Sequence, residues 1–373
     1  MGRSDTIDLI ELYRVAMPLI TPWTTAYGSD AAVETVLVRM VSDGVEGWGE
    51  SCPLGTPTYS PEYAAGVFHV VRDFMAPRVL GRAIASGQEL QDRLSCFKGN
   101  RFAKAALDVA WWDVRARKAS QPLWRLIGGT SQTIEVGMAF GVGENLEALI
   151  DGVGDAVKSG FKRVKLKYCP GWDLPIVEAV RKAFPDLVLH IDCNCGYTPA
   201  DLPMFKQLDQ FGLAMIEQPL GYGDLVDHAE LQRRISTPIC LDESIASPDH
   251  ARQAIHLGAC RWINIKPGRV GGLTEALKIH DLCRQADLPC WMGSMLDSGV
   301  GTSVLVALGT LPNMKYPGDI LPGDRLYKED LASPSICLSG PAQITAPSSP
   351  GIACAPDPQR LKSMTAEHVV LEN

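Results

Sequence analysis

Four ionisable residues recur at nearly equal spacing through the middle of the chain. Asp192, Glu217, Asp242 and Lys266 lie 25, 25 and 24 positions apart. Each closes a short apolar run, and the runs read LVLHID, LAMIE, PICLDE and WINIK. Runs of this length are typical of buried parallel strands. Side chains at the carboxyl ends of such strands meet at the mouth of a barrel. We therefore expect three carboxylates and an amine to converge there.

The three carboxylates point to a hard metal ion. They offer only oxygen ligands, which suits Mg²⁺ or Mn²⁺. Zinc would favour histidine or cysteine, and although Cys193 and Cys195 adjoin Asp192, only one side of a strand end faces the mouth. A single strand-end carboxylate is more often a helix cap or a solvated charge. Three carboxylates spaced at the interval of the strand repeat favour a metal site instead.

Two further amines end an earlier apolar segment. Lys165 and Lys167 are two positions apart, so their side chains share one face of a strand. Two amines on the inner face of a buried strand need anionic partners. Lys266 should lie about opposite them, so that a bound substrate meets an amine on each of its faces. Neighbouring cations and partial burial would lower the pKa of such an amine toward the range useful for a base.

The pattern around these residues predicts repeated strand–helix units. We expect barrel strands near residues 134–140, 161–167, 187–192, 213–217, 238–242, 261–266, 288–292 and 313–319. Eight such units would close a barrel. The part before them predicts strands at 7–17 and 33–42, a hairpin marked by Gly44 and Gly47, and helices at 61–80 and 102–118. We therefore divide the chain into a first unit (1–130), a barrel (131–322) and a C-terminal segment (323–373) that packs back on the first unit.

Composition excludes several classes of protein. The chain has 373 residues and a formal net charge of −8, which argues against nucleic acid or an anionic membrane as its main partner. No apolar stretch approaches the roughly 18–20 residues that span a bilayer, and the first twenty residues lack the apolar core of a signal peptide. We expect a cytoplasmic homo-oligomer. Its eleven cysteines are odd in number and scattered, which favours reduced thiols.

Several motifs together resemble a known family. In order, these are GWGESCP, GNRFAKAALDVAWWD, VKLKYCPGWD, HIDCNCGY, MIEQP, CLDES and NIKPGRVGG. They resemble the muconate-lactonizing subgroup of the enolase superfamily, and within it the N-acylamino acid racemase/o-succinylbenzoate synthase family. The resemblance covers nearly the whole chain. It implies an α/β fold in which an α+β capping domain, formed by both chain ends, covers a (β/α)7β TIM-like barrel.

The resemblance also implies roles for individual residues. It assigns metal ligation to Asp192, Glu217 and Asp242, acid–base catalysis to Lys167 and Lys266, and supporting contacts to Lys165, Asn194 and Glu243. The implied chemistry is Mg²⁺-dependent removal of the α-proton of a carboxylate to give an enediolate. Return of the proton from the other lysine would invert the carbon, whereas loss of a β-leaving group would be a dehydration.

The chain departs from the family on the substrate side of the mouth. Ala139 stands where a hydroxyl is expected, and Ser294 and Met295 stand in a segment where relatives commonly carry a Gly-Gly-Met-Leu run. Two segments, Met17–Asp30 and Glu50–Tyr59, should cover the mouth as irregular loops. Their aromatic residues could form an apolar lid on an acyl group; these are Trp23, Tyr27 and Tyr59. Ordinary packing between the two domains is the alternative.

Three functions remain open from the sequence. The first is a racemase or epimerase of an N-acyl amino acid or a related small carboxylate. The second is a syn-dehydratase or cycloisomerase on the same site, resembling o-succinylbenzoate synthase or muconate-lactonizing enzyme. The third is a non-catalytic barrel that only binds a ligand, which should have lost a metal ligand or a lysine, and none is lost.

Overall fold

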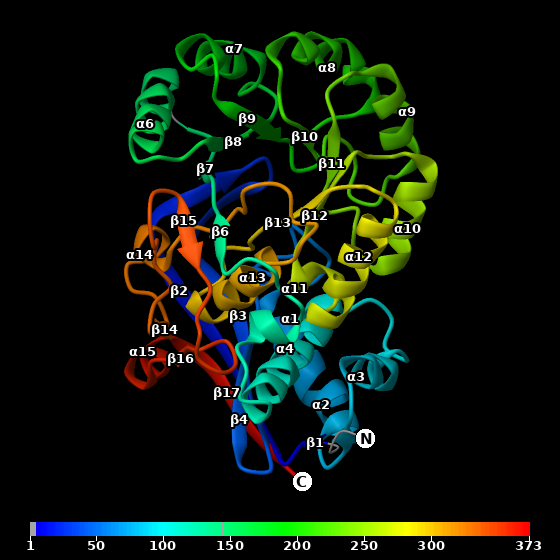
Figure 1. The fold of residues 1–373 in the computed structure, drawn as a ribbon, viewed down its shortest axis with the longest axis vertical. Coiled ribbons are helices and arrows are strands. Elements are labelled where there is room, and N and C mark those ends of the chain that lie inside the picture. The colour runs from blue at the N-terminus through cyan, green and yellow to red at the C-terminus, as the bar shows by residue number, and fades with distance from the viewer. Residues whose placement is uncertain (1–4, 144) are drawn as a thin grey trace.

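The computed structural model describes residues 5–143 and 145–373. Its first unit is built on a four-stranded antiparallel sheet in the order β17-β2-β3-β4 (Figure 1). The strands are β2 (Leu9–Thr25), β3 (Gly28–Ser42), β4 (Val45–Ser51) and β17 (Thr365–Glu372). Because β17 pairs with β2, the C-terminal end of the chain completes the sheet that the N-terminal end begins.

Helices cover this sheet, and one of them approaches it closely. The helical elements are α1 (Ala64–Val70), the π-helix η1 (Val71–Met75), α2 (Ala76–Val79), α3 (Gly87–Leu94), α4 (Arg101–Lys118) and α5 (Leu123–Leu126). A Cβ atom on Gly49 would lie 2.5 Å from the backbone nitrogen of Ala110 in α4. A Cβ on Gly47 would approach Val114 equally closely, so Gly47 serves packing, while Asp43 and Gly44 make the hairpin turn with positive φ.

The second unit is a curled sheet of seven parallel strands in sequential order from β7 to β13. The strands are β7 (Met138–Phe140), β8 (Arg163–Lys167), β9 (Val188–Asp192), β10 (Ile216–Glu217), β11 (Ile239–Leu241), β12 (Trp262–Ile265) and β13 (Cys290–Met292). The helices that follow them are α6 (Leu146–Lys158), α7 (Leu174–Ala183), α8 (Leu202–Leu208), α9 (Val226–Arg234), α10 (Pro248–Leu257), α12 (Leu273–Gln285) and α13 (Gly299–Gly309).

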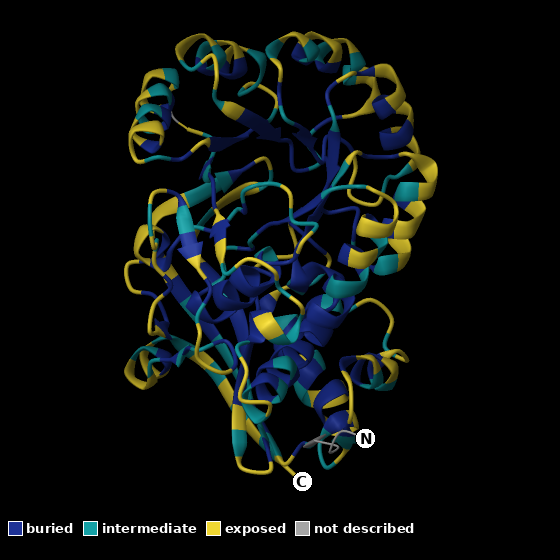
Figure 2. Ribbon diagram, viewed as in Figure 1, coloured by how far each residue is buried: buried dark blue, intermediate teal, exposed yellow. Residues whose placement is uncertain are grey.

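Figure 2 shows buried strands inside a ring of helices that expose their outer faces. This arrangement confirms the expected barrel with a separate α+β cap. The shorter elements are β1 (Asp5–Thr6), β5 (Ala83–Ile84), β6 (Thr133–Glu135), η2 (Pro199–Asp201), η3 (Asp209–Phe211), α11 (Pro267–Val270), α14 (Gly323–Leu326), β14 (Ala332–Ser333), β15 (Gln343–Thr345), β16 (Ala355–Pro356) and α15 (Pro358–Met364). No helix within the described residues is long and apolar enough to cross a membrane.

The expected eighth strand at 313–319 is wrong as a regular strand. Only isolated parallel bridges join this segment to its neighbours, at Met314 and Asp319 on the β13 side and at Gly318 on the side of the first strand. Pro317 lies inside the segment and lacks the N–H that a ladder needs. The expected first strand is also split, because β6 pairs with β15 whereas β7 joins the barrel.

The expectation that Met17–Asp30 is an irregular loop is also wrong. This segment is the tip of the long β2–β3 hairpin, and its strands remain paired as far as Thr25 and Gly28. The register shifts between Pro18 and Trp23, so the strand bulges where its prolines fall. The hairpin therefore reaches the barrel as a paired ribbon.

A buried carboxylate joins the cap to the barrel. Glu50, at the end of β4, accepts hydrogen bonds from the backbone N–H groups of Ser298 (3.1 Å) and Gly301 (2.8 Å) and from the Ser298 hydroxyl. Ser298 is the N-cap residue of α13 and Gly301 lies in its first turn, where backbone N–H groups have no partner inside the helix. Glu50 therefore caps a barrel helix from the other domain.

This joint gives a prediction about stability. Glu50→Ala would leave buried N–H groups of α13 without an acceptor and should lower the free energy of unfolding by about 3 kcal/mol. Glu46→Ala, on the exposed part of the same strand, should lower it by less than about 0.5 kcal/mol. Chemical denaturation of both variants measures the difference. Equal midpoints for the two variants would mean that Glu50 does not hold the cap on the barrel.

Candidate active site

Lysines and carboxylates form a buried cluster where strands β8, β9 and β10 end. Backbone pairing sets Lys167 beside Asp192, and Asp192 beside Glu217. The ammonium nitrogen of Lys165 lies 2.8 Å from Asp192, 2.9 Å from Glu217 and 3.1 Å from Asp319. The Nζ atom of Lys167 lies 2.7 Å from Asp192. The two lysines thus have the anionic partners that their burial requires.

A second cluster lies around Asp242, just beyond β11. Nζ of Lys266 lies 2.9 Å from this carboxylate, which also pairs with the guanidinium of Arg269. The Tyr59 hydroxyl, which comes from the cap, donates to Asp242 at 2.9 Å. Lys266 Nζ is 3.3 Å from the same hydroxyl and 4.7 Å from the centre of the Tyr59 ring. A cap residue therefore completes the surroundings of a barrel carboxylate and a barrel lysine.

Asn194 and Glu243 connect the two clusters. Lys167 donates to the side-chain oxygen of Asn194 at 2.6 Å, and the Asn194 amide donates to Glu243 at 3.1 Å. Burial, assisted by the charge of Asp192, raises the pKa of Glu243 to about 7. Asn194 adopts a left-handed backbone conformation with φ of 42°, which asparagine tolerates better than most residues. The chain thus bends at this point to bring the amide between the lysine and the acid.

Mutual neutralisation governs the charges of this site. Burial works against the charged form of Lys165, but Asp192, Glu217 and Asp319 outweigh burial and hold its pKa well above the usual value. Burial likewise works against the charge of Asp192, and Lys165 and Lys167 hold the pKa of that carboxyl well below its usual range. Burial of His190, which lies 3.4 Å from Glu217, lowers the pKa of the imidazole to about 4 and keeps it neutral.

The donor set is chemically suited to a hard cation, although ammonium groups balance it in this structure. Glu217 Oε2 and Asp242 Oδ2 are buried and face basic groups: Lys165 at 2.9 Å and His190 at 3.4 Å for Glu217, and Lys266 at 2.9 Å for Asp242. Within the residues that the structure describes, no three acidic, histidine or cysteine side chains already converge on one point as a ligand set. A divalent cation at these carboxylates would therefore compete with Lys165 and Lys266.

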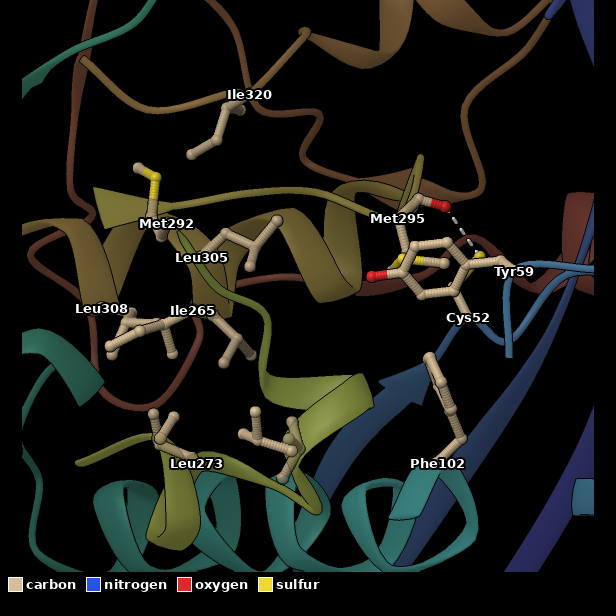
Figure 3. Packing of buried hydrophobic residues seen from close by; sticks show 14 of the residues in the cluster. Cys52, Tyr59, Phe102, Ile265, Leu273, Met292, Met295, Leu305, Leu308 and Ile320 are labelled. Atoms are coloured by element: carbon tan, nitrogen blue, oxygen red, sulfur yellow. Dashed lines mark hydrogen bonds between the residues drawn. The ribbon is translucent and has the colours of Figure 1, made fainter. Parts of the chain in front are cut away.

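A cavity above the cluster connects the barrel mouth with the lid. Its walls include the three lysines Lys165, Lys167 and Lys266. They also include the residues expected in the lid and after the seventh strand, which are Trp23, Tyr27, Tyr59, Ser294 and Met295. Tyr59 lies against Met295, whose carbonyl accepts a hydrogen bond from Cys52 at 3.1 Å (Figure 3). Ala139 also lines the cavity, so the expected departure lies where a substrate would bind. Four acids do not line the cavity, but each contacts a residue that does; these are Asp192, Glu217, Asp242 and Glu243.

Sequence reasoning missed two charged residues of this site. Asp319 contacts Lys165 and Arg163, and it ends the segment expected as the eighth strand, so the strand-end argument used for Asp192 could have found it. Arg269 lies three residues after Lys266 in α11 and is fully buried, with its Nε donating to the carbonyl of Ile245 at 2.8 Å. The arginine within the NIKPGRVGG motif was the available signal.

Comparisons with known proteins match both units. Residues 9–128 match the family model of the mandelate racemase/muconate lactonizing enzyme N-terminal domain, and residues 148–360 match the model described as enolase C-terminal domain-like. Together the two models cover most of the chain.

Individual relatives match over nearly their full length. An o-succinylbenzoate synthase from Geobacillus kaustophilus is 42% identical over 360 residues, covering 96% of each chain. An N-succinylamino acid racemase from Amycolatopsis sp is 42% identical over 361 residues, covering 96% of this chain and 98% of the relative. A solved enolase-superfamily structure from Listeria innocua superposes with a TM-score of 0.95 at 36% identity and covers 99% of both chains. The chain therefore belongs to the mandelate racemase/muconate-lactonizing enzymes of the enolase superfamily.

Proposed function

We propose that this enzyme removes the α-proton of a small carboxylate and returns a proton to the opposite face, racemising or epimerising an N-acyl amino acid or a related acid. One observation carries the proposal above the others. Lys167 is the last residue of β8, and Lys266 comes directly after β12. The three strands between β8 and β12 carry a carboxylate at or just after their ends, and these are Asp192, Glu217 and Asp242. A substrate held over those carboxylates would have one amine on each side.

The two lysines carry the proton transfers in this proposal. One amine, in its neutral form, takes the α-proton and leaves an enediolate, and the ammonium of the other donates to the opposite face. Lys167 is held by Asp192 and Asn194, and Lys266 is held by Asp242 and Tyr59. These contacts orient both nitrogens in the cavity wall, which is what a two-base racemase requires.

We assign Asp192, Glu217 and Asp242 as the residues that hold Mg²⁺ or Mn²⁺. When bound, such an ion would supply positive charge to the carboxylate of the substrate and stabilise the enediolate. The buried carboxylate oxygens of Glu217 and Asp242 support this assignment, because each faces an ammonium charge that a bound cation could replace. Lys165 is assigned to the substrate carboxylate, because its ammonium already bridges two of the three acids.

A dehydration of the o-succinylbenzoate synthase type is the second candidate. Several relatives at about 40% identity carry that name. It would use the same acids and the same first proton transfer, but the leaving group would depart from the face on which the proton is removed, so a single base would suffice. The two candidates differ in how α-hydrogen exchange depends on the lysines: a racemase needs both Lys167 and Lys266, whereas a one-base dehydratase needs one of them.

The metal assignment predicts a loss of both binding and turnover. EDTA should abolish α-proton exchange, and Mg²⁺ or Mn²⁺ should restore it. Asp242→Asn keeps the size of the side chain but removes a charged ligand, and it should weaken Mn²⁺ binding in calorimetry by at least about tenfold. Asp151→Asn, on the exposed face of α6, is the matched control and should bind as the parent does. Full turnover by a demonstrably metal-free sample would refute the assignment.

The two-lysine arrangement predicts opposite selectivity in two variants. Lys266→Ala should abolish racemisation, with a loss of about 10²–10⁴-fold or more, yet still exchange the α-hydrogen of one enantiomer slowly in ²H₂O. Lys167→Ala should exchange only the other enantiomer. Proton NMR of both enantiomers with each variant measures this, and Lys162→Ala, an exposed lysine before β8, is the control. If both variants exchange the same enantiomer, the one-base dehydratase becomes the better account.

A further inference from the structure

The cavity above the catalytic cluster has an apolar outer wall with one charged side chain in it. Trp23, Leu54, Leu296, Leu321 and Leu326 contribute the apolar surface. Asp30 lies among them, on the β2–β3 hairpin, directly across the strand pair from Trp23. The lid is therefore not purely apolar, because its hairpin brings a carboxylate to the wall of this cavity.

Asp30 differs from the other charged residues that line this cavity. Lys165, Lys167, Lys266 and Asp319 each have at least one partner of opposite charge within 3.1 Å. Asp30 has no ion pair or hydrogen bond from its side chain to any residue in the described part of the chain. Burial alone raises the pKa of its carboxyl group, with no cation to offset it. A half-buried carboxylate without a protein partner favours a ligand group that is cationic or donates hydrogen bonds.

Within the described residues, the wall around Asp30 carries no cation that could pair with a second carboxylate. The three cavity lysines are engaged with acids, and no other lysine or arginine of the described chain lines this cavity. Arg325 lines an adjoining groove instead of this cavity; it is exposed and its guanidinium stacks 5.7 Å from the centre of the Phe161 ring. A substrate with an anionic end away from the reacting carboxylate would therefore place that end near Asp30, where like charges repel.

We propose that Asp30 selects substrates whose end distant from the reacting carboxylate carries an ammonium or guanidinium group, and rejects those that carry a second carboxylate there. This inference rests on the proposed function and narrows its substrate class. It separates this chain from relatives whose names specify succinyl compounds, which bear a carboxylate at the distant end. Trp23 would pack on the aliphatic part of the same group, because it shares the strand pair with Asp30.

Two matched series of compounds test this preference with Mg²⁺ present. The side-chain series is N-acetyl-lysine, N-acetyl-norleucine and N-acetyl-2-aminoadipate, which end in a cation, a methyl group and an anion. The acyl series is N-β-alanyl-, N-propionyl- and N-succinyl-norleucine, with the same order of charges. Both kcat/KM for α-hydrogen exchange and the dissociation constant are measured. In at least one series the cationic member should exceed the neutral member by about fivefold, as a partly exposed ion pair allows, and the anionic member should be the poorest in both.

Variants attribute the preference to one side chain. Asp30→Asn should remove the difference between the cationic and neutral members, and Asp30→Lys should make the anionic member the best of its series. Arg325→Gln is the control and should leave the order of the parent unchanged. If the parent prefers the anionic members, or if Asp30→Asn keeps the preference for the cation, the inference is wrong.

The two measurements keep this inference apart from the function on which it rests. Binding in the expected order without any α-hydrogen exchange would uphold the role of Asp30 and overturn the proposed reaction. If several of the compounds exchange their α-hydrogen at rates that do not depend on the charge of the distant end, the proposed reaction would be upheld and the role of Asp30 overturned. A changed order of the three charge types in Arg325→Gln would place the selection in the adjoining groove and also contradict it.

Discussion

The structure depends on the mutual neutralisation of charges that are buried at the mouth of the barrel. Isolated ions are expensive to bury, so the carboxylates and amines at this place must be brought within a few ångströms of one another. Lys165 does this for Asp192 and Glu217, and Lys266 and Arg269 do it for Asp242. The register of the parallel strands sets the distances between these amines and carboxylates. The strand ends therefore carry a high free-energy cost of burying charge and tolerate little change in position.

The same constraint explains why the cap is part of the site. The Tyr59 hydroxyl reaches Asp242 from the cap, and Glu50 caps helix α13 in the barrel. Because β17 pairs with β2, the end of the chain helps to hold the cap that supplies Tyr59. The buried charges at the barrel mouth are therefore completed by contacts between segments that are far apart in the sequence. The β2–β3 hairpin, whose tip lines the cavity, belongs to the same sheet of the cap.

Some of this could be predicted from the sequence because it follows from local periodicity. The spacing of Asp192, Glu217 and Asp242 reflects one strand–helix unit each, so the amino-acid pattern alone predicts that they lie at neighbouring strand ends. Their convergence on one point is not seen among the described residues, because Lys165 bridges two of them. The paired positions of Lys165 and Lys167 likewise required anionic partners, and those are present. Family motifs added the cap, whose strands come from both ends of the chain.

The remainder depended on contacts that no local pattern records. The closure of the barrel at Pro317 uses isolated bridges in place of a ladder, and the hairpin at Met17–Asp30 is paired in spite of its prolines. Arg269 and Asp319 are site residues through partners distant in the sequence. Asp30 shows the same limit, since its lack of a partner becomes visible only when its surroundings are known.

We propose that Asp192, Glu217 and Asp242 hold a divalent cation between the two lysines Lys167 and Lys266. Anomalous diffraction from crystals grown with Mn²⁺ tests it most directly. We expect one strong peak within ligand distance, about 2.0–2.3 Å, of oxygens from all three carboxylates, with Lys165 no longer bridging Asp192 and Glu217. A fully ion-paired cluster without a peak, or a peak bound by other residues, would contradict it.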